Sequence, residues 1–154
     1  MNPSTDLLET ALHTLPHGPE FRFIDRLISL TPGKEGVGEY RVRGDESFLP
    51  GHFPGEPLFP GVLLVEAAAQ LAGIVAQTDS TMPPLAKLRL AALRNVKILG
   101  TAKPGDTFSI RAAITGRLGA LIQAEAECFL QERTILAASL TLGGNPAARD
   151  NPIV

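Results

Sequence analysis

Residues 51–77 read GHFPGEPLFPGVLLVEAAAQLAGIVAQ, a loop rich in proline and glycine followed by an almost wholly apolar segment. Within residues 61–77 apolar side chains occupy nearly every helical face, which is typical of a helix buried on all sides. Four residues interrupt this pattern at i, i+4, i+7 and i+11 and therefore share one stripe, here called the polar seam: Glu66, Gln70, Gly73 and Gln77. The sequence predicts a central buried helix with one polar seam.

The same stretch carries two side chains suited to proton transfer. His52 lies in the loop, where Gly51 and Pro54-Gly55 limit backbone freedom, and Glu66 lies in the helix. Histidine and glutamate are common general acids and bases near neutral pH. We therefore predict that His52 and Glu66 form an acid/base pair.

Composition indicates a compact domain and excludes several classes of partner. The 154 residues are 44% hydrophobic and 19% charged, so one domain over residues 1–143 is expected, with a frayed tail at 144–154. Fourteen Lys and Arg against sixteen Asp and Glu leave a net charge of −2 without a basic block, which argues against nucleic acid and membrane surfaces. The apolar helix is shorter than the ~20 residues that span a bilayer.

Cysteine and histidine usage argues against disulfides and metals. Cys128 is the single cysteine, and the three histidines at 13, 17 and 52 have no zinc spacing. The N-terminus lacks the basic and apolar regions of a signal peptide. We therefore expect a cytoplasmic protein without metal or cofactor.

The remaining segments predict a helix and a sheet around the central helix. A short helix is expected near residues 4–15, extended segments at 21–30 and 36–43, and a strand at the end of 85–99. Apolar and polar residues then alternate in three runs typical of an antiparallel meander: 108–115, 122–130 and 136–142. The apolar face is rich in alanine, so the helix can lie close to it. The predicted architecture is α+β, one long buried helix wrapped by a curved antiparallel sheet.

Three motifs resemble those of a known family. Leu15-Pro16-His17 followed by Phe21 to Arg26, then residues 51–70, then Pro104-Gly105-Asp106, are similar to the opening strand, the central motif and the late turn of FabZ-like 3-hydroxyacyl-(acyl-carrier-protein) dehydratases. The resemblance covers most of the chain and implies the hotdog fold. It also implies removal of water from (3R)-3-hydroxyacyl thioesters to give trans-2-enoyl thioesters, in fatty acid or related acyl-chain biosynthesis.

The resemblance assigns roles to four residues. His52 is implied as the catalytic histidine, Glu66 as the catalytic acid, and Gln70 as its neighbour one helical turn on. The N–H of Gly61, after Pro60 and at the positive end of the helix dipole, is implied to receive the thioester carbonyl, although Gly61 can also simply start the helix. His17, in the Leu-Pro-His element, is interpreted as a turn or packing histidine.

The resemblance also implies partners. These are an acyl carrier protein bearing a phosphopantetheine-linked chain, or acyl-coenzyme A, and further copies of the chain in a homodimer or a trimer of dimers, with His52 and Glu66 of one site on different chains. Carrier contacts are expected at Arg94, Lys97 and Lys103. The chain departs from the family pattern at residues 98–103, which lack the usual aromatic and basic residues, and at Gly18-Pro19-Glu20.

Two other functions remain open from the residues alone. Hotdog domains also hydrolyse acyl thioesters with a carboxylate that activates water, and an acyl-binding subunit without catalysis is the second alternative. An apolar tunnel for the acyl chain is expected between the buried helix and the sheet. The acyl chain length, the carrier and the pathway are left undetermined.

Overall fold

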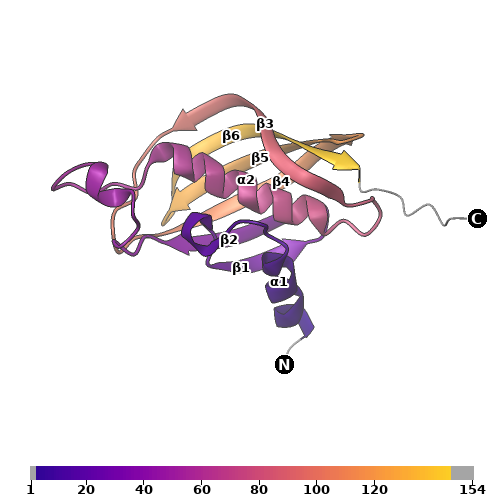
Figure 1. Cartoon of the computed structure of the whole chain (residues 1–154), viewed down its shortest axis with the longest axis horizontal. Coiled ribbons are helices and arrows are strands. Elements are labelled where there is room, and N and C mark those ends of the chain that lie inside the picture. Colours follow the sequence, from indigo (N-terminus) through magenta and orange to yellow (C-terminus); the bar gives the residue numbers. More distant parts are fainter. Residues whose placement is uncertain (1–2, 147–154) are drawn as a thin grey trace, which may run out of the picture.

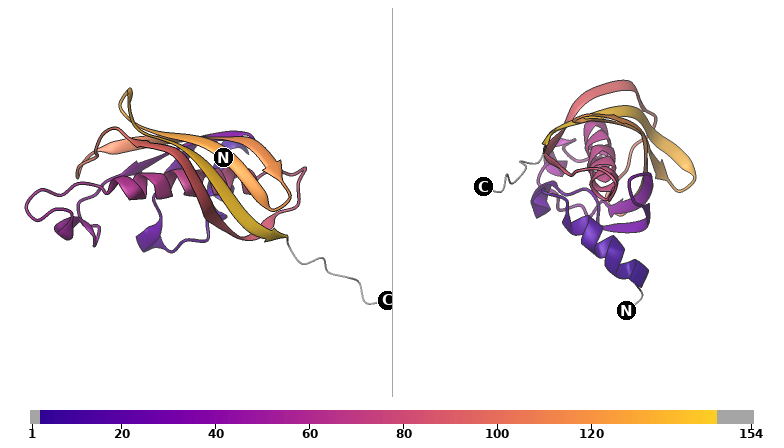
Figure 2. Two further views of the ribbon diagram at one scale, coloured as in Figure 1. Left: turned by 90° about the horizontal axis from the view of Figure 1, so that it is seen from above. Right: turned by 90° about the vertical axis from the view of Figure 1, so that its right-hand side faces the viewer.

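The computed structural model of the protein describes residues 3–146, which form two α-helices and one six-stranded sheet. The elements are α1 Pro3–His13, β1 Arg26–Thr31, β2 Glu35–Arg41, α2 Gly61–Gln77, β3 Leu85–Ile98, β4 Thr107–Leu118, β5 Leu121–Leu130 and β6 Arg133–Pro146, with 3-10 turns at Pro19–Phe21 and Leu49–Gly51. The strand order is β1-β2-β4-β5-β6-β3, and every neighbouring pair is antiparallel. The sheet curves around α2, which confirms the predicted α+β hotdog architecture (Figures 1 and 2).

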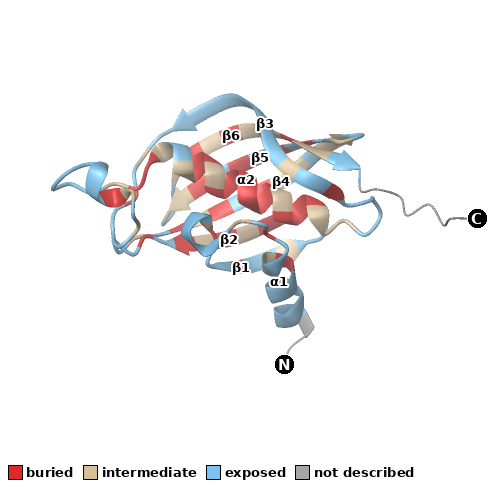
Figure 3. Ribbon diagram, in the orientation of Figure 1, coloured by how far each residue is buried: buried red, intermediate tan, exposed pale blue. Residues whose placement is uncertain are grey.

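Helix α2 has the predicted bounds and is the centre of the core. Its alanines are buried and belong to the same core cluster as alanines of the sheet, as Figure 3 shows by the buried colouring where α2 faces β4, β5 and β6. The backbones approach so closely that a Cβ on Gly36 of β2 would lie 2.9 Å from the Cγ2 of Val75. No helix among residues 3–146 has the length and apolar character needed to cross a membrane.

The period-2 runs also form the predicted strands. Along β5 the residues alternate strictly between exposed and buried from Leu121 to Cys128, and the first half of β4 follows the same pattern. Side chains on one face therefore reach the core, as alternation requires. At one end of this core lies an aromatic cluster of Phe23, Tyr40, Phe59 and Phe108, whose ring centroids are 5.3–5.7 Å apart in five of the pairs. Phe59 ends the loop before α2, so the cluster anchors that loop.

Two expected boundaries differ in the structure. The first strand begins at Arg26 rather than at residue 21, because Pro19–Phe21 form a 3-10 turn and Phe23 and Ile24 are held in the core by their side chains. At the other end β6 continues past residue 143 to Pro146, so the first three residues of the expected 144–154 tail are part of the described strand. Asn145 and Pro146 pair with Ala86 and Leu85 of β3. Residues 147–154 lie outside the described part of the chain.

The sheet has two unlike edges. Strand β1 is short and lies beside α1, whereas β3 is fourteen residues long and pairs with β6 along one side only. Register shifts interrupt the β3–β6 pairing, and Lys87 and Asn95 within them have φ values of 53° and 51°. The outer side of β3 borders the site described next.

Candidate active site

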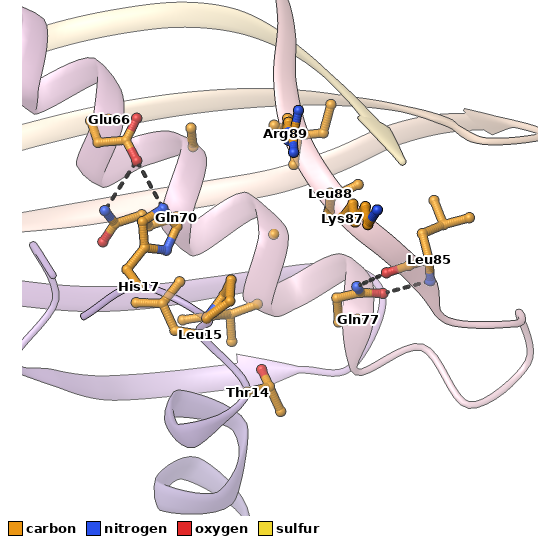
Figure 4. Close-up of a pocket in the computed structure, with 15 residues that line it drawn as sticks. Thr14, Leu15, His17, Glu66, Gln70, Gln77, Leu85, Lys87, Leu88 and Arg89 are labelled. Carbon is orange, nitrogen blue, oxygen red and sulfur yellow. Dashed lines mark hydrogen bonds and ion pairs between the residues drawn. The ribbon is translucent and has the colours of Figure 1, made fainter. Parts of the chain in front are cut away.

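A cavity of about 560 Å³ lies beside α2, toward β3. All four residues of the polar seam line it, together with residues 14–17 after α1 and, at the start of β3, Leu85, Lys87, Leu88 and Arg89 (Figure 4). The acyl tunnel was expected between helix and sheet. The cavity opens at the β3 end of the sheet rather than over its alanine-rich centre, because α2 and the central strands pack too closely to leave space there.

Glu66 stands at the wall of this cavity with one of its two oxygens held. Gln70 Nε2 donates to Glu66 Oε1 at 3.1 Å, and His17 Nε2 lies 3.2 Å from the same oxygen. Figure 4 shows both contacts on one oxygen while the other points away from them. The Glu66 side chain keeps 24% of its surface exposed, so a substrate in the cavity can reach it.

Gln70 uses its whole amide to connect α2 to the segment before β1. Besides the bond to Glu66, its Nε2 donates to the Phe21 carbonyl at 2.9 Å and its Oε1 accepts the Phe23 N–H at 2.9 Å. Both amide hydrogens and the carbonyl oxygen are therefore occupied in a residue that is only 2% exposed. A fully paired buried amide has one orientation, so the donor directed at Glu66 is fixed.

His52 is held by the loop that carries it. Its Nδ1 lies 2.8 Å from the Leu58 carbonyl, and its ring stacks on Phe53 with centroids 4.2 Å apart. A carbonyl oxygen only accepts hydrogen bonds, so Nδ1 carries the proton and the neutral ring presents the lone pair of Nε2. The Leu58 N–H donates in return to the His52 carbonyl at 2.7 Å. In this tautomer Nε2 is the ring nitrogen that can accept a proton.

Gly61 is the first residue of α2 and follows Pro60. The N–H groups of a first helical turn have no acceptor inside the helix, so this N–H is available to a carbonyl oxygen. A Cβ at Gly61 would also lie 2.9 Å from two atoms of the Ile98 side chain at the end of β3. The close approach of β3 therefore requires glycine at this position.

His52 and Glu66 are not brought together within one chain. His52 is absent from the lining of the cavity, and among residues 3–146 no hydrogen bond or ion pair joins the two side chains. The segment between β2 and α2 instead extends beyond the end of the sheet (Figure 1). His52 and Glu66 are each held by their own neighbours, and within residues 3–146 they make no hydrogen bond or ion pair with each other.

The three expected carrier contacts lie outside the cavity. Arg94 and Lys97 are exposed on β3, and Lys103 is exposed in the connection to β4. Inside the cavity the structure adds His17, Lys87 and Arg89, to which the sequence analysis gave no role in the site. The Leu-Pro-His motif was the available signal for His17. Among residues 3–146 no group of three or more candidate ligands for a metal ion is found.

Cys128 is placed away from this chemistry. It is buried on β5, and its thiol donates to the Leu64 carbonyl at 3.7 Å. Burial raises the pKa of the Cys128 thiol to about 12, so the thiolate needed for nucleophilic attack is not formed near neutral pH. The site therefore depends on imidazole and carboxyl groups.

Comparison with known sequences finds relatives over most of the chain. Residues 15–139 match a family model described as a FabA-like domain. A 3-hydroxyacyl-(acyl-carrier-protein) dehydratase FabZ of Syntrophobacter fumaroxidans is 35% identical over 138 residues, which cover 88% of this chain and 93% of the relative. The FabZ of Geobacter metallireducens is 43% identical over 103 residues, which cover 66% of this chain and 69% of the relative.

Solved structures show the same fold at low identity. The dehydratase heterocomplex ApeI:P from Xenorhabdus doucetiae aligns with a TM-score of 0.74 and 16% identity, covering 89% of this chain and 91% of that one. Zebra fish thioesterase superfamily member 2 aligns with a TM-score of 0.67 and 13% identity, covering 92% of this chain and 99% of that one. At these identities the likeness concerns the fold, which serves more than one reaction.

Proposed function

The chain belongs to the FabA-like domain family, and on this basis we propose that it is a 3-hydroxyacyl-(acyl-carrier-protein) dehydratase, a lyase that acts in fatty acid or related acyl-chain biosynthesis. It removes water from (3R)-3-hydroxyacyl thioesters to give trans-2-enoyl thioesters. The observation that carries this proposal is the Glu66 carboxyl, which has one oxygen fixed by Gln70 and one oxygen free at a cavity large enough for an acyl chain.

The elimination divides between three groups. Nε2 of His52 takes a proton from C2 of the substrate, and the N–H of Gly61 stabilises the negative charge that develops on the thioester carbonyl oxygen. Glu66 gives its proton to the departing C3 hydroxyl, which leaves as water while the C2–C3 double bond forms. Return of the proton from His52 to Glu66 completes the cycle, and no redox partner or metal is consumed.

A second copy of the chain supplies the missing half of the site. Because His52 and Glu66 lie apart within one chain, the proposal pairs His52 of one subunit with Glu66 of another. The open edge of β3 supports this assembly, since it exposes the apolar side chains Leu90, Leu93, Val96 and Ile98 beside unpaired backbone groups. The assembly is at least a homodimer, and a trimer of dimers is compatible with it.

The acyl group reaches the site on a carrier. Arg94, Lys97 and Lys103 give β3 and its following loop an exposed positive charge that can steer an acidic acyl carrier protein, despite the net charge of −2. Acyl-coenzyme A is the competing carrier. A cytoplasmic location accompanies this proposal, since the single cysteine is buried and no disulfide is needed.

The decisive experiment follows products by mass spectrometry. Purified protein is incubated with a panel of 3-hydroxyacyl thioesters that differ in chain length and carrier. A product lighter by one water, with no free thiol, supports the dehydratase. Release of free thiol would instead identify a thioester hydrolase, and binding without turnover would identify an acyl-binding subunit.

A further inference from the structure

We infer that His17 is a positioning residue for Glu66, which donates from Nε2 to Oε1 and thereby makes Oε2 the oxygen that carries the transferred proton. This inference rests on the proposed function, in which Glu66 is the acid. It assigns a role to a histidine that the sequence analysis interpreted as a turn or packing residue.

The first observation is that two nitrogen atoms converge on one oxygen. Gln70 Nε2 and His17 Nε2 lie 3.1 and 3.2 Å from Glu66 Oε1, and no bond within residues 3–146 engages Oε2 (Figure 4). The hydrogen bond from Gln70 and the His17 nitrogen at ion-pair distance both place positive partial charge beside Oε1, whether the carboxyl is ionised or protonated. This disfavours a proton on Oε1, so the acid form carries its proton on Oε2, which leaves Glu66 ready to donate toward the cavity.

The second observation concerns the other nitrogen of His17. Its Nδ1 is buried and has no partner among the described residues. A hydrogen placed there would be a buried donor without an acceptor, and such donors are rarer in folded proteins than acceptors with an unused lone pair. The neutral ring therefore carries its hydrogen on Nε2, the nitrogen that lies 3.2 Å from Glu66 Oε1. This is the reverse of His52, whose hydrogen is on Nδ1.

The third observation is that the ring itself is held in place. It stacks on Phe21 at 6.2 Å between centroids with an interplanar angle of 23°, and the His17 carbonyl accepts from Arg22 at 3.2 Å. Gln70 binds the Phe21 carbonyl, so the segment that carries His17 is tied to the helix that carries Glu66. Both donors to Oε1 are thus fixed by the same short segment.

Steady-state kinetics with two variants tests the role. His17→Phe keeps the stacking ring and removes the donor, whereas His17→Gln keeps a donor. We expect His17→Phe to lower kcat by about 10- to 100-fold, the loss for one hydrogen bond to a charged group, with KM changed by less than about twofold. His17→Gln should recover at least about half of that loss on a logarithmic scale. A kcat within about twofold of the wild type for folded His17→Phe would overturn the proposal.

A combined variant separates positioning from general damage. In a Glu66→Gln background the carboxyl is already gone, so adding His17→Phe should lower the residual rate by less than about twofold. A further loss equal to that of His17→Phe alone would mean that His17 acts independently of Glu66, and would overturn the inference.

Nitrogen NMR of the imidazole tests the geometry without any turnover. The ring of His17 should show the Nε2–H tautomer, and Glu66→Ala should change the Nε2 signal of His17 while leaving that of His13, which is exposed on α1, unaffected. An Nδ1–H tautomer of His17 would refute the inference. If the NMR result is as expected but no thioester is dehydrated, the proposed function fails and the contact between His17 and Glu66 stands.

Discussion

The two edge strands of the sheet differ in how far their outer backbone groups are protected from pairing with another chain. Strand β1 has six residues, lies beside α1, and carries Arg26 in an ion pair with Glu39 of β2. Strand β3 has fourteen residues, has no neighbour on its outer side within residues 3–146, and exposes four large apolar side chains. Open edges invite pairing with another chain, and short length, charge and cover are the usual protections. Strand β1 has all three protections, whereas β3 carries charged residues such as Arg94 and Lys97 but is neither short nor covered within residues 3–146, so β3 is the edge on which we propose that a partner pairs.

The difference between the edges matters because the candidate site lies at the unprotected one. The cavity is bounded by the start of β3, and Gly61 at the start of α2 packs against Ile98 at its end. A partner that pairs with β3 therefore arrives beside Glu66. The well-protected edge carries none of the expected catalytic residues.

The largest expected effect comes from inactivating His52 and Glu66 separately and then mixing the two variants, so that subunits of both kinds pair across β3. His52→Ala and Glu66→Gln should each lower turnover by ~100-fold or more, the scale for losing a positioned acid or base. When the two variants are refolded together, half of the dimers carry one intact site, so about one quarter of the wild-type activity should return. The measurement is the rate of enoyl thioester formation before and after mixing.

The control for this experiment mixes wild-type chains with a chain that carries both substitutions. Each site of a mixed dimer then contains one substituted residue, so mixed dimers are inactive and only the wild-type dimers contribute activity. Failure of the two single variants to complement each other, with dimers present, would mean that both groups act from the same chain.

A smaller loss is expected when a charge is placed on each edge in turn. Leu93 on β3 and Ile28 on β1 are 43% and 46% exposed, so they form a matched pair. Leu93→Glu should give a monomer by sedimentation and lower activity about tenfold or more, because an unpaired carboxylate would be buried at the interface. Ile28→Glu should leave both assembly and activity within about twofold. Equal effects at the two sites would contradict the assignment of β3 as the assembly edge.

The smallest effect is expected for the charges that accompany β3. Charge reversal at Arg94, Lys97 and Lys103 should raise KM for a carrier-linked substrate by several-fold, roughly the effect of rim charges, and more at low salt than at high salt. A short N-acetylcysteamine thioester should be converted at an unchanged rate. Lys34→Glu, an exposed charge in the β1–β2 turn, is the control. Unchanged KM at every salt concentration would favour acyl-coenzyme A as substrate.

Much of the fold follows from local patterns. Helix α2 matches its predicted bounds because Pro60 and Gly61 mark its start and its apolar faces continue to Gln77. The alternating runs at 108–115, 122–130 and 136–142 likewise predict strands that the structure contains as β4, β5 and β6. The continuation of β6 past Gly143 was missed because glycines give no period-2 signal, yet Gly144 is required there, since a Cβ would lie 2.9 Å from that of Leu85. The start of β1 was misjudged because Phe23 and Ile24 are buried without being paired in a strand.

The site was predictable in its residue types and less so in its contacts. His52, Glu66, Gln70 and Gly61 are found in motifs, and the i, i+4 spacing of Glu66 and Gln70 predicted their contact. The contact of His17 with Glu66 depends on how the segment before β1 crosses α2, which is a long-range property without a local pattern. The tautomers of both histidines likewise come from tertiary neighbours, the Leu58 carbonyl for His52 and the buried setting of Nδ1 for His17.

The hydrogen bonds between Gln77 and Leu85 give the cavity a definite far end. Gln77 Nε2 donates to the Leu85 carbonyl at 2.6 Å and Gln77 Oε1 accepts the Leu85 N–H at 3.1 Å, so the end of α2 is closed against the start of β3. Gln77 follows Glu66 by eleven residues of continuous helix, a rise of about 16 Å. The distance from Glu66 to this closed end therefore limits the length of an extended acyl chain that can lie along the polar seam. A longer chain has to fold back or extend out of the cavity.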